Sequence, residues 1–561
     1  MSGENEDIIY YIYERYKRKM SCLLNSNERS DMKNKILMLL CLAISTSMSA
    51  QLVNNGGTIT IQQGATLYVE SDVENNASGT ITIMGDGELE VQGDLDNSAG
   101  TLTANGDAII RFTGSDASNV TAGTHSIANI VVGKTGTNVV MLDDMTVGSE
   151  VSFESASKLD VGANVLTLEP AATVTAAAND RYIIADGGVG GSVSKEKNNT
   201  DDFKFEIGDA TSYAPVEVTG MSGTTSGTST IAASTEAIKA PNAPAEATDF
   251  INRHWDISAA NITDFEATLE GEYADNDIDG AADEAKLSGA GYDDIEWDYT
   301  NSTGTAATNL VTVDVDYDNV EFTATNKFGK VDLTVFLEGA FSGTAMTTSL
   351  RDQDLIPLTS PYAADPVTVT SLPANLVDWV LVEVRDAAAP STVLSSSSAF
   401  LLSDGSVTSI DGSGAARLKD ASGSNIIAIR HRNHLPVRTN VALDVDSPSP
   451  FDFSSSTDVY EDSGLTTDNM KTVGGTKVLW GGNANFNDQL QYNGGGLNDR
   501  IAMLFEVGFA TTSIPTAVGY YDEDVNMDGF VQYNGGGLND RIMLLFNVGF
   551  TTTSIPLLAH L

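Results

Sequence analysis

Cysteine is nearly absent from this 561-residue chain, because its two cysteines, Cys22 and Cys41, both lie within the first fifty residues. Residues 32–50 have a basic start, an apolar run and a Ser-Met-Ser-Ala ending, which is the layout of a secretory signal peptide. The alternative is a membrane anchor, but the apolar run is short for a helix that spans a bilayer. We therefore expect cleavage after Ala50 and a mature chain with no disulfide and no transmembrane segment.

Residues 1–31 stand upstream of this signal peptide. We interpret them as a mis-assigned extension, with Met32 as the true start, and a cytosolic extension is the alternative. Cleavage of the signal peptide predicts a protein that is secreted or displayed on the cell surface.

Basic residues are also scarce, with 30 Lys and Arg against 77 Asp and Glu and a formal net charge of -47. Such a charge repels nucleic acids and anionic membranes, so we expect no nucleic-acid partner. It favours solubility and the binding of divalent cations. Hydrophobic residues make up 41% of the chain and occur in strand-like runs, which argues against disorder.

The sequence lacks the common catalytic motifs. It has no H-E-x-x-H, no G-x-S-x-G and only five histidines. His431 and His434 could form half of a metal site, but a turn explains them better. Lys134 sits in a phosphate-loop-like Gly-Lys-Thr, yet the following NVVMLDD predicts a strand where a phosphate loop needs a helix. We therefore expect a protein that is not an enzyme.

Three stretches in the N-terminal region repeat one another. They begin with GTITIQQ at Gly57, GTITIMG at Gly79 and GTLTANG at Gly100, and each alternates β-branched and polar residues. A repeat this short cannot bury its apolar side alone and must stack on its neighbours. The pattern predicts a parallel β-solenoid over residues 51–185, with an ordinary meander or sandwich as the alternative.

The rest of the chain is long enough for further domains. Its strand patterns predict two antiparallel β-sandwich modules, over residues 186–345 and 346–445. Residues 446–561 then form a polar linker and a duplicated region, since QYNGGGLNDR occurs at 491–500 and again at 532–541. Helices are expected only in this last region. The predicted fold class is therefore mainly β, with a small helical pair at the C-terminus.

The second copy begins like an EF-hand calcium loop. Such a loop has side-chain oxygens at positions 1, 3 and 5, a Gly at position 6 and a backbone carbonyl at position 7. These positions are filled by Asp524, Asn526, Asp528, Gly529 and Phe530. The position of the closing carboxylate holds Gly535, so we expect Asp540, after a short insertion, to supply that ligand. Hard oxygen ligands on a tight turn favour Ca²⁺ over softer metals.

Two weaker calcium candidates are present. In the first copy the corresponding ligands are neutral amides and one carboxylate, Asn483, Asn485, Asn487 and Asp499. The third candidate, DNDIDGAADEAK, carries Asp275, Asp277, Asp279 and Asp283 at ligand spacing but has Lys286 in the closing position. For all three segments the alternative is a polar turn that binds no metal.

The two C-terminal loops, each followed by a helix, resemble type I dockerin modules, in the variant that ends many exported proteins of Bacteroidetes. DVNMDGFVQYNGGGLNDR and LWGGNANFND carry the most specific part of the likeness. WVLVEVRD, IRHRNHLPV, GDATSYAPVEV and NRHWDIS extend the likeness over about residues 200–561. It implies an exported, calcium-stabilised protein whose tail docks to a cohesin-like or other surface protein.

From these features we expect a non-enzymatic protein for adhesion or for assembly of an extracellular complex. The alternative is a protein that binds or degrades polysaccharide with the solenoid or with a sandwich module. A groove of acids and aromatic rings on the solenoid would favour the alternative, and a smooth Thr-rich surface would favour adhesion or assembly.

Overall fold

The computed structural model describes residues 51–561 except 77, 245, 413, 466, 510–516 and 551–556. The signal peptide, residues 1–31 and both TTSIP segments therefore lie outside the described residues. Strands account for 47% of the chain and helices for 6%, and the strands begin with a β-solenoid of about seven turns. The predicted fold class is confirmed. The chain divides into a first unit, up to Ile183, and a second unit, Ile184–Leu561.

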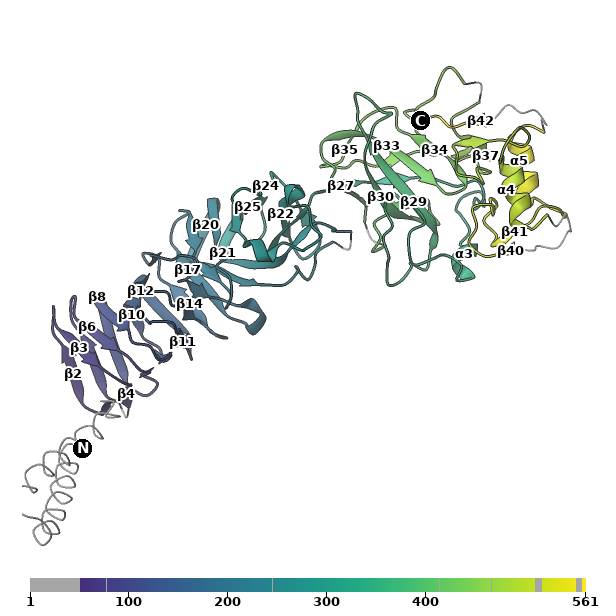
Figure 1. Ribbon diagram of the computed structural model, residues 1–561. Helices are drawn as coiled ribbons and strands as arrows, with labels where there is room; N and C mark the ends of the chain where they lie inside the picture. Colours follow the sequence, from purple (N-terminus) through teal and green to yellow (C-terminus); the bar gives the residue numbers. More distant parts are fainter. Residues whose placement is uncertain are drawn as a thin grey trace, which may run out of the picture. The chain divides into compact units, whose positions relative to one another are not determined.

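The first unit is a stack of parallel strands, drawn in purple and blue in Figure 1. One parallel sheet comprises β1 (Leu52–Asn55), β4 (Val73–Asn76), β7 (Leu95–Asp96), β9 (Ser118–Thr121), β11 (Val139–Met141) and β13 (Leu159–Asp160). The remaining strands of the coils are β2 (Thr58–Ile61), β3 (Thr66–Val69), β5 (Thr80–Ile83), β6 (Glu88–Val91), β8 (Thr101–Phe112), β10 (Ser126–Val132), β12 (Met145–Phe153), β14 (Val165–Leu168) and β15 (Thr173–Thr175). Strand β16 (Ile183–Ile184) lies at the boundary between the units.

The predicted parallel stacking of the repeats is confirmed. Strand β2 pairs in parallel with β5, and β5 pairs with β8, so that Thr58, Thr80 and Thr101 lie side by side. The alternating apolar residues of these strands, such as Ile81 and Leu102, point inward and are fully buried. Stacking of neighbouring coils therefore creates the core that a single repeat could not form.

A ladder of buried asparagines explains part of the repeat. Asn54 donates to Asn75 Oδ1 at 2.9 Å, and Asn75 donates to Asn97 Oδ1 at 2.7 Å, with one amide on each successive coil. A Cβ at Gly79 would lie 2.5 Å from Asn75 Oδ1, which is closer than side chains tolerate. The glycine that opens this repeat is thus needed because the ladder passes directly beside it.

We expect Asn75→Ala to loosen the solenoid locally. Asn75 is fully buried, and its loss leaves the Oδ1 of Asn97 without its donor and removes one acceptor of Asn54 Nδ2, which costs about 1–3 kcal/mol. Hydrogen exchange measured by mass spectrometry should show faster exchange of the neighbouring strands. Asn55→Ala, at an exposed position of the preceding coil, is the control and should leave exchange unchanged. Equal exchange in the two variants would contradict a stabilising ladder.

The second unit begins with an antiparallel module around the two long strands β20 (Val216–Glu236) and β21 (Phe250–Glu272), which pair along their lengths. The other strands are β17 (Ser192–Lys197), β18 (Phe203–Phe205), β19 (Ile207–Gly208), β22 (Leu287–Tyr292), β23 (Trp297–Asp298), β24 (Thr303–Thr305), β25 (Leu310–Val315) and β26 (Asn319–Asn326). Short 3-10 helices are η1 (Gly187–Val189), η2 (Asp275–Asp277) and η3 (Glu284–Lys286).

A second sheet follows in the order β34-β33-β29-β30-β31-β28-β36. Its strands, with the edge strand β35, are β28 (Leu333–Thr334), β29 (Leu376–Arg385), β30 (Val393–Leu402), β31 (Ser406–Thr408), β33 (Ser424–His431), β34 (His434–Arg438), β35 (Leu443–Asp444) and β36 (Phe451–Asp452). Strands β27 (Phe328–Val331) and β32 (Ala416–Lys419) form a separate pair. The sequence placed the VDLTVFLEG strand in the module before this sheet, but Leu333 pairs with Val407 of β31.

The C-terminal region carries the predicted helices, α4 (Asp499–Glu506) and α5 (Asp540–Asn547), which lie side by side in Figure 1. Three strand pairs accompany them: β37 (Lys471–Val473) with β38 (Thr476–Val478), β39 (Gln489–Leu490) with β42 (Leu557–Leu558), and β40 (Ala517–Val518) with β41 (Phe530–Val531). The expectation that helices occur only here was wrong, because α3 (Ser349–Asp352) adds one turn elsewhere.

Candidate metal centre

In the second loop, residues 524–540, the Asp540 carboxylate lies against the beginning of the loop. Its Oδ1 accepts from Val525 N at 2.8 Å, and its Oδ2 accepts from Gln532 N at 2.7 Å. Asp540 is the first residue of α5, and Asn539 caps this helix by accepting from Ile542 N. The helix therefore holds the carboxylate in place, and Asp540 is the acidic side chain that closes the loop after Gly535.

The first position of the loop is equally enclosed. Asp524 is fully buried, and its two oxygens accept from Asp528 N at 3.1 Å and Gly529 N at 2.9 Å. Gly529 has φ +89°, a left-handed conformation that favours glycine. The turn thus wraps around the Asp524 carboxylate. Asn526 and Asp528 hydrogen-bond to each other through their side chains at 3.0 Å, and Phe530 begins β41.

Burial makes these carboxylates costly to ionise. It raises the pKa of Asp524 to about 7, and burial together with the Asp524 charge raises the pKa of Asp540 well above its usual range. Neither group forms a salt bridge within the described part of the chain. The charge of Arg432 lowers the pKa of Asp524 in part, without a salt bridge. Two buried carboxylates close enough to repel each other provide the oxygen chemistry that a hard cation satisfies.

The second loop does not contain a compact cluster of three His, Cys, Asp or Glu side chains. Across the described ranges, no group of three or more His, Cys, Asp or Glu side chains is arranged to hold a metal ion. A cation in the second loop would therefore need oxygens from Asn526 and from the Phe530 carbonyl as well as from carboxylates.

The first loop, residues 483–499, repeats the arrangement with fewer charges. Asp499 is fully buried at the start of α4, and its carboxylate accepts from Gln491 N at 2.6 Å and Asn485 N at 3.4 Å. Burial raises the pKa of Asp499 to about 7. Asn483 accepts from Asn487 N at 3.0 Å. The buried Oδ1 of Asn485 has no hydrogen-bond partner, so an oxygen at a proposed ligand position is left unsatisfied.

The two copies are joined by reciprocal contacts. Arg541 of the second copy donates to the hydroxyl of Tyr492 at 3.0 Å, and Arg500 of the first copy donates to the hydroxyl of Tyr533 at 3.4 Å. Each arginine also donates to the main-chain oxygen of the tyrosine in its own copy. The duplicated sequence therefore folds as two similar halves that contact each other through equivalent residues.

The third candidate segment has a different role. Asp277 is buried and receives two hydrogen bonds from Arg253, at 2.6 and 3.1 Å. Asp275 accepts from Asn309, while Asp279 and Asp283 accept from the backbone of their own turns. The structure thus does not bring the four carboxylates together, and a guanidinium neutralises the only one that is buried.

The two histidines lie in the hairpin between β33 and β34 and are fully buried. His434 Nε2 accepts from Gly339 N at 3.0 Å, and its Nδ1 lies 2.7 Å from Asn433 Oδ1. His431 Nε2 faces Asp378 at 3.1 Å. This network assigns the proton of His434 to Nδ1. The ring nitrogens are therefore used within the protein.

Low pH should destabilise this hairpin. Burial lowers the pKa of His431 and lowers that of His434 well below its usual range. The unfolded chain therefore binds more protons, and the stabilising contribution is complete above about pH 6.5 and is lost as pH falls toward the folded-state values. A proton on His434 Nε2 would also face Gly339 N–H. Buried acids with raised pKa values, such as Glu523, act in the opposite direction. Thermal unfolding in saturating calcium at pH 7.5, 6.5 and 5.5 would therefore measure the histidine contribution as the difference between the native chain and His434→Gln, which should grow as pH falls.

Other sequence candidates have structural explanations. Lys134 is fully buried, and its ammonium donates to Gln92 O and Thr113 O, each at 2.6 Å, while the strand predicted after it is β11.

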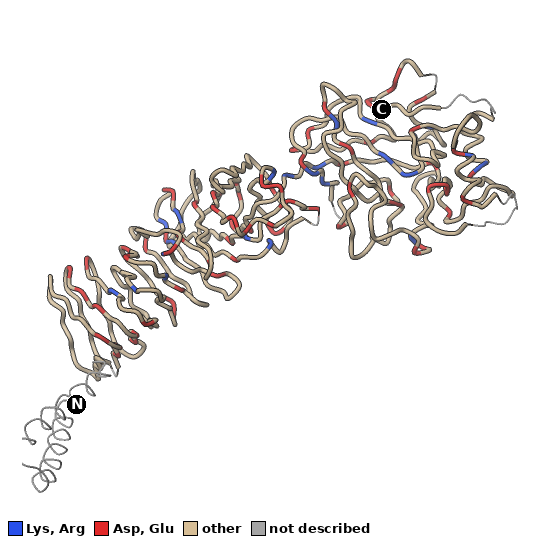
Figure 2. Tube along the Cα trace, in the orientation of Figure 1, with Lys and Arg blue, Asp and Glu red and all other residues tan. Residues whose placement is uncertain are grey.

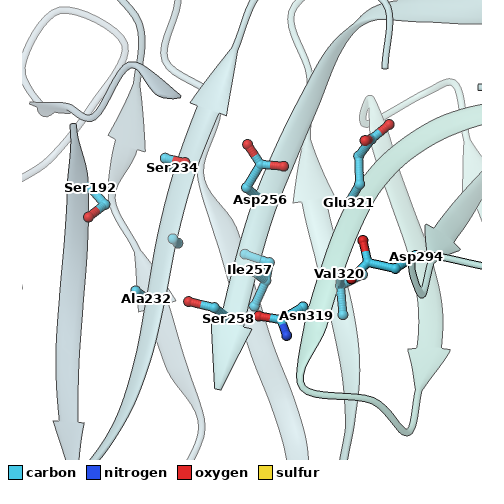
Figure 3. Close-up of a pocket in the computed structure, with 11 residues that line it drawn as sticks. Ser192, Ala232, Ser234, Asp256, Ile257, Ser258, Asp294, Asn319, Val320 and Glu321 are labelled. Carbon is cyan, nitrogen blue, oxygen red and sulfur yellow. The ribbon is translucent and has the colours of Figure 1, made fainter. Parts of the chain in front are cut away.

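A cavity of about 270 Å³ in the first antiparallel module (Figure 3) is lined by Ser192, Ser234, Asp256, Asn319 and Glu321, among others. Asp256 and Glu321 lie opposite each other on β21 and β26. Figure 2 shows acidic residues along both units.

Sequence reasoning missed the residues that connect the loops to the second sheet. Arg432 donates to Tyr521 O and, at 2.9 Å, to Asp378 Oδ2, and Gln353 donates to Asp528 O at 2.9 Å. Arg432 belongs to the IRHRNHLPV stretch that carried part of the resemblance, whereas no pattern singled out Gln353. Partners this far apart in sequence leave no local signal.

The chain has no significant match to a protein-family model, a curated protein or a solved structure. Within the described residues, no helix is both long enough and apolar enough to span a membrane. Conclusions about the site therefore rest on its own geometry.

Proposed function

We propose that this chain is an exported, non-enzymatic protein of the cell surface or extracellular space, whose dockerin-like C-terminal pair of loops binds calcium. The observation that carries the calcium proposal is the closure of the second loop by Asp540 beside a buried Asp524, with no salt bridge to either carboxylate among the described residues. Ca²⁺ prefers such hard oxygen ligands and tolerates irregular geometry.

A role in adhesion or assembly is supported by the surface of the solenoid. Hydroxyl side chains occupy equivalent positions on successive coils of one face. They are Thr60, Thr82, Thr103, Ser126, Thr146 and Thr167. This regular row corresponds to the smooth Thr-rich surface expected of an adhesion or assembly protein, whereas the adjacent strands place Tyr68 beside Glu90.

Docking to a protein partner is supported by exposed apolar side chains on the C-terminal pair. Phe505 and Phe546 occupy equivalent positions of α4 and α5, and are 53% and 46% exposed. Phe509 and Phe550 pack on them, with ring centroids 5.0 and 4.7 Å apart. Grouped exposed aromatic rings are typical of interaction surfaces, and a cohesin-like or other surface protein is the partner we propose.

Calorimetric titration of the whole mature chain with Ca²⁺ would test the metal site. We expect binding accompanied by a rise in melting temperature, and Asp540→Asn should weaken the affinity of the second loop by at least about ten-fold because it removes a charged ligand. Asp283→Asn removes a carboxylate from the third candidate segment and should change nothing. If the native chain released no binding heat and did not gain stability with calcium, the loops would be polar turns.

A further inference from the structure

One residue in a hairpin of the second sheet contacts both duplicated loops. Asn433 lies in the turn between β33 and β34 and is fully buried. Its main-chain oxygen accepts from Asn483 N at 3.0 Å, and its side-chain Nδ2 donates to Asp524 O at 2.6 Å. Asn483 and Asp524 are the first positions of the two loops. Equivalent residues of the two copies thus meet on the same asparagine.

His434 fixes the orientation of the Asn433 amide. Its Oδ1 faces His434 Nδ1 at 2.7 Å, so its Nδ2 must point to Asp524 O. His434 is held in turn by Gly339 N–H and by His431, which contacts Asp378. All of these side chains are buried. The Asn433 amide therefore keeps its donor side toward the second loop and does not turn the other way.

The second sheet and the segment before it also hold other parts of the second loop. Gln353 donates to Asp528 O at 2.9 Å, and a Cβ at Gly339 would lie 2.2 Å from Val525 O. The short strands of the two loops pair elsewhere, β39 with β42 and β41 with β40. In the part of the chain that the structure describes, no strand pairing joins the two loops directly. Asn433 therefore adds a connection between their first positions to the arginine–tyrosine contacts that join the two copies.

We propose that Asn433 is a positioning residue shared by the two calcium loops, and that it couples their occupancy. This inference rests on the proposed calcium binding. When calcium orders the backbone at Asp524, the bond to Asn433 places the Asn433 carbonyl, which in turn fixes Asn483 N. The first loop carries mainly neutral ligands, so it gains most from being ordered by the charged second loop.

The test uses the whole mature chain and its Asn433→Ala variant, titrated with Ca²⁺ by calorimetry. Loss of one hydrogen bond at the loop should weaken calcium binding about three- to ten-fold. Asp540→Asn disables the second loop, and it should weaken binding at the first loop in the native background but not in the Asn433→Ala background. Gln353→Ala, which contacts only the second loop, is the matched control and should leave this coupling intact.

Melting temperatures separate positioning from a general structural role. A positioning role predicts that Asn433→Ala reduces the increase in melting temperature that calcium causes. If Asn433 had only a structural role, Asn433→Ala would lower the melting temperature by the same amount with calcium and with EDTA and would leave calcium affinity unchanged. That result would overturn the inference. If the native chain itself bound no calcium, the proposed function would fail first. If calcium bound and Asn433→Ala had no effect on affinity or coupling, only the inference would fail.

Discussion

Replacing Arg253 with leucine is expected to lower the free energy of unfolding of the second unit by about 3–5 kcal/mol, because removing one partner of a buried ion pair leaves uncompensated charge. The Arg253 side chain is fully buried and donates to Asp277 at 2.6 Å, to Asp209 at 2.6 Å and to Thr235 at 3.1 Å. Burial alone would lower the pKa of the guanidinium, but these two carboxylates raise it. Arg253 therefore remains charged, and its loss leaves two carboxylates without a counter-charge.

Urea unfolding followed by tryptophan fluorescence would measure this effect, because Trp255 lies two residues away on β21 and is fully buried. Lys204→Leu is the matched control. It removes a cation from the partly exposed pair with Glu272 and should cost less than about 1 kcal/mol. Adding Asp209→Asn and Asp277→Asn to Arg253→Leu should recover much of the loss, since the stranded charges disappear. A loss below 1 kcal/mol for Arg253→Leu would show that water reaches these acids.

The solenoid could be predicted from sequence because its contacts are local in the repeat. Each strand pairs with the strand about one period later, so spacing of the glycine-started repeats specifies both neighbours and register. The position of Asp540 could also be predicted, because the duplication places Asp499 at the same point in the first copy. The solenoid repeats and the duplicated loops can each be aligned with another copy in the same sequence, and that alignment shows which positions are equivalent.

The third calcium candidate shows where local patterns fail. Asp275, Asp277 and Asp279 have the spacing of loop ligands, yet Asp277 is bound by Arg253 of strand β21. A guanidinium and a metal ion satisfy a buried carboxylate in similar ways. Only the tertiary structure decides which cation is present, because Arg253 lies outside the segment that carries the ligand spacing.

The dependence of the C-terminal loops on the second sheet could not be predicted for the same reason. Asp378 and Tyr520 are separated by 142 residues, but the tyrosine hydroxyl donates to Asp378 Oδ1 at 2.6 Å. A polar residue inside the LVDWVLVEVR strand, where neighbouring side chains are apolar, was the one available signal. Because an acid fully buried in such a strand needs several donors, its presence implies a partner network.

We therefore expect Asp378→Ala to lower the free energy of unfolding of the second unit by about 3–5 kcal/mol. Burial would raise the pKa of Asp378, but Arg432, His431 and Tyr520 together lower it to about 2. The carboxylate is thus charged at neutral pH and balances Arg432, which it contacts at 2.9 Å. Without Asp378, a buried guanidinium loses its counter-ion. Urea unfolding followed by tryptophan fluorescence would measure the loss.

Tyr520→Phe is the matched control, because it removes one hydrogen bond to Asp378 and leaves the ion pair in place. It should cost about 0.5–3 kcal/mol. Since Arg432 also donates to Tyr521 O beside the second loop, Asp378→Ala should weaken calcium binding more than Tyr520→Phe does. Equal stability losses in the two variants would mean that Arg432 finds another partner. If Asp378→Ala bound calcium with unchanged affinity, the second loop would hold its shape without Arg432. A loop that Arg432 supports must lose calcium affinity when Asp378, the counter-ion of Arg432, is removed.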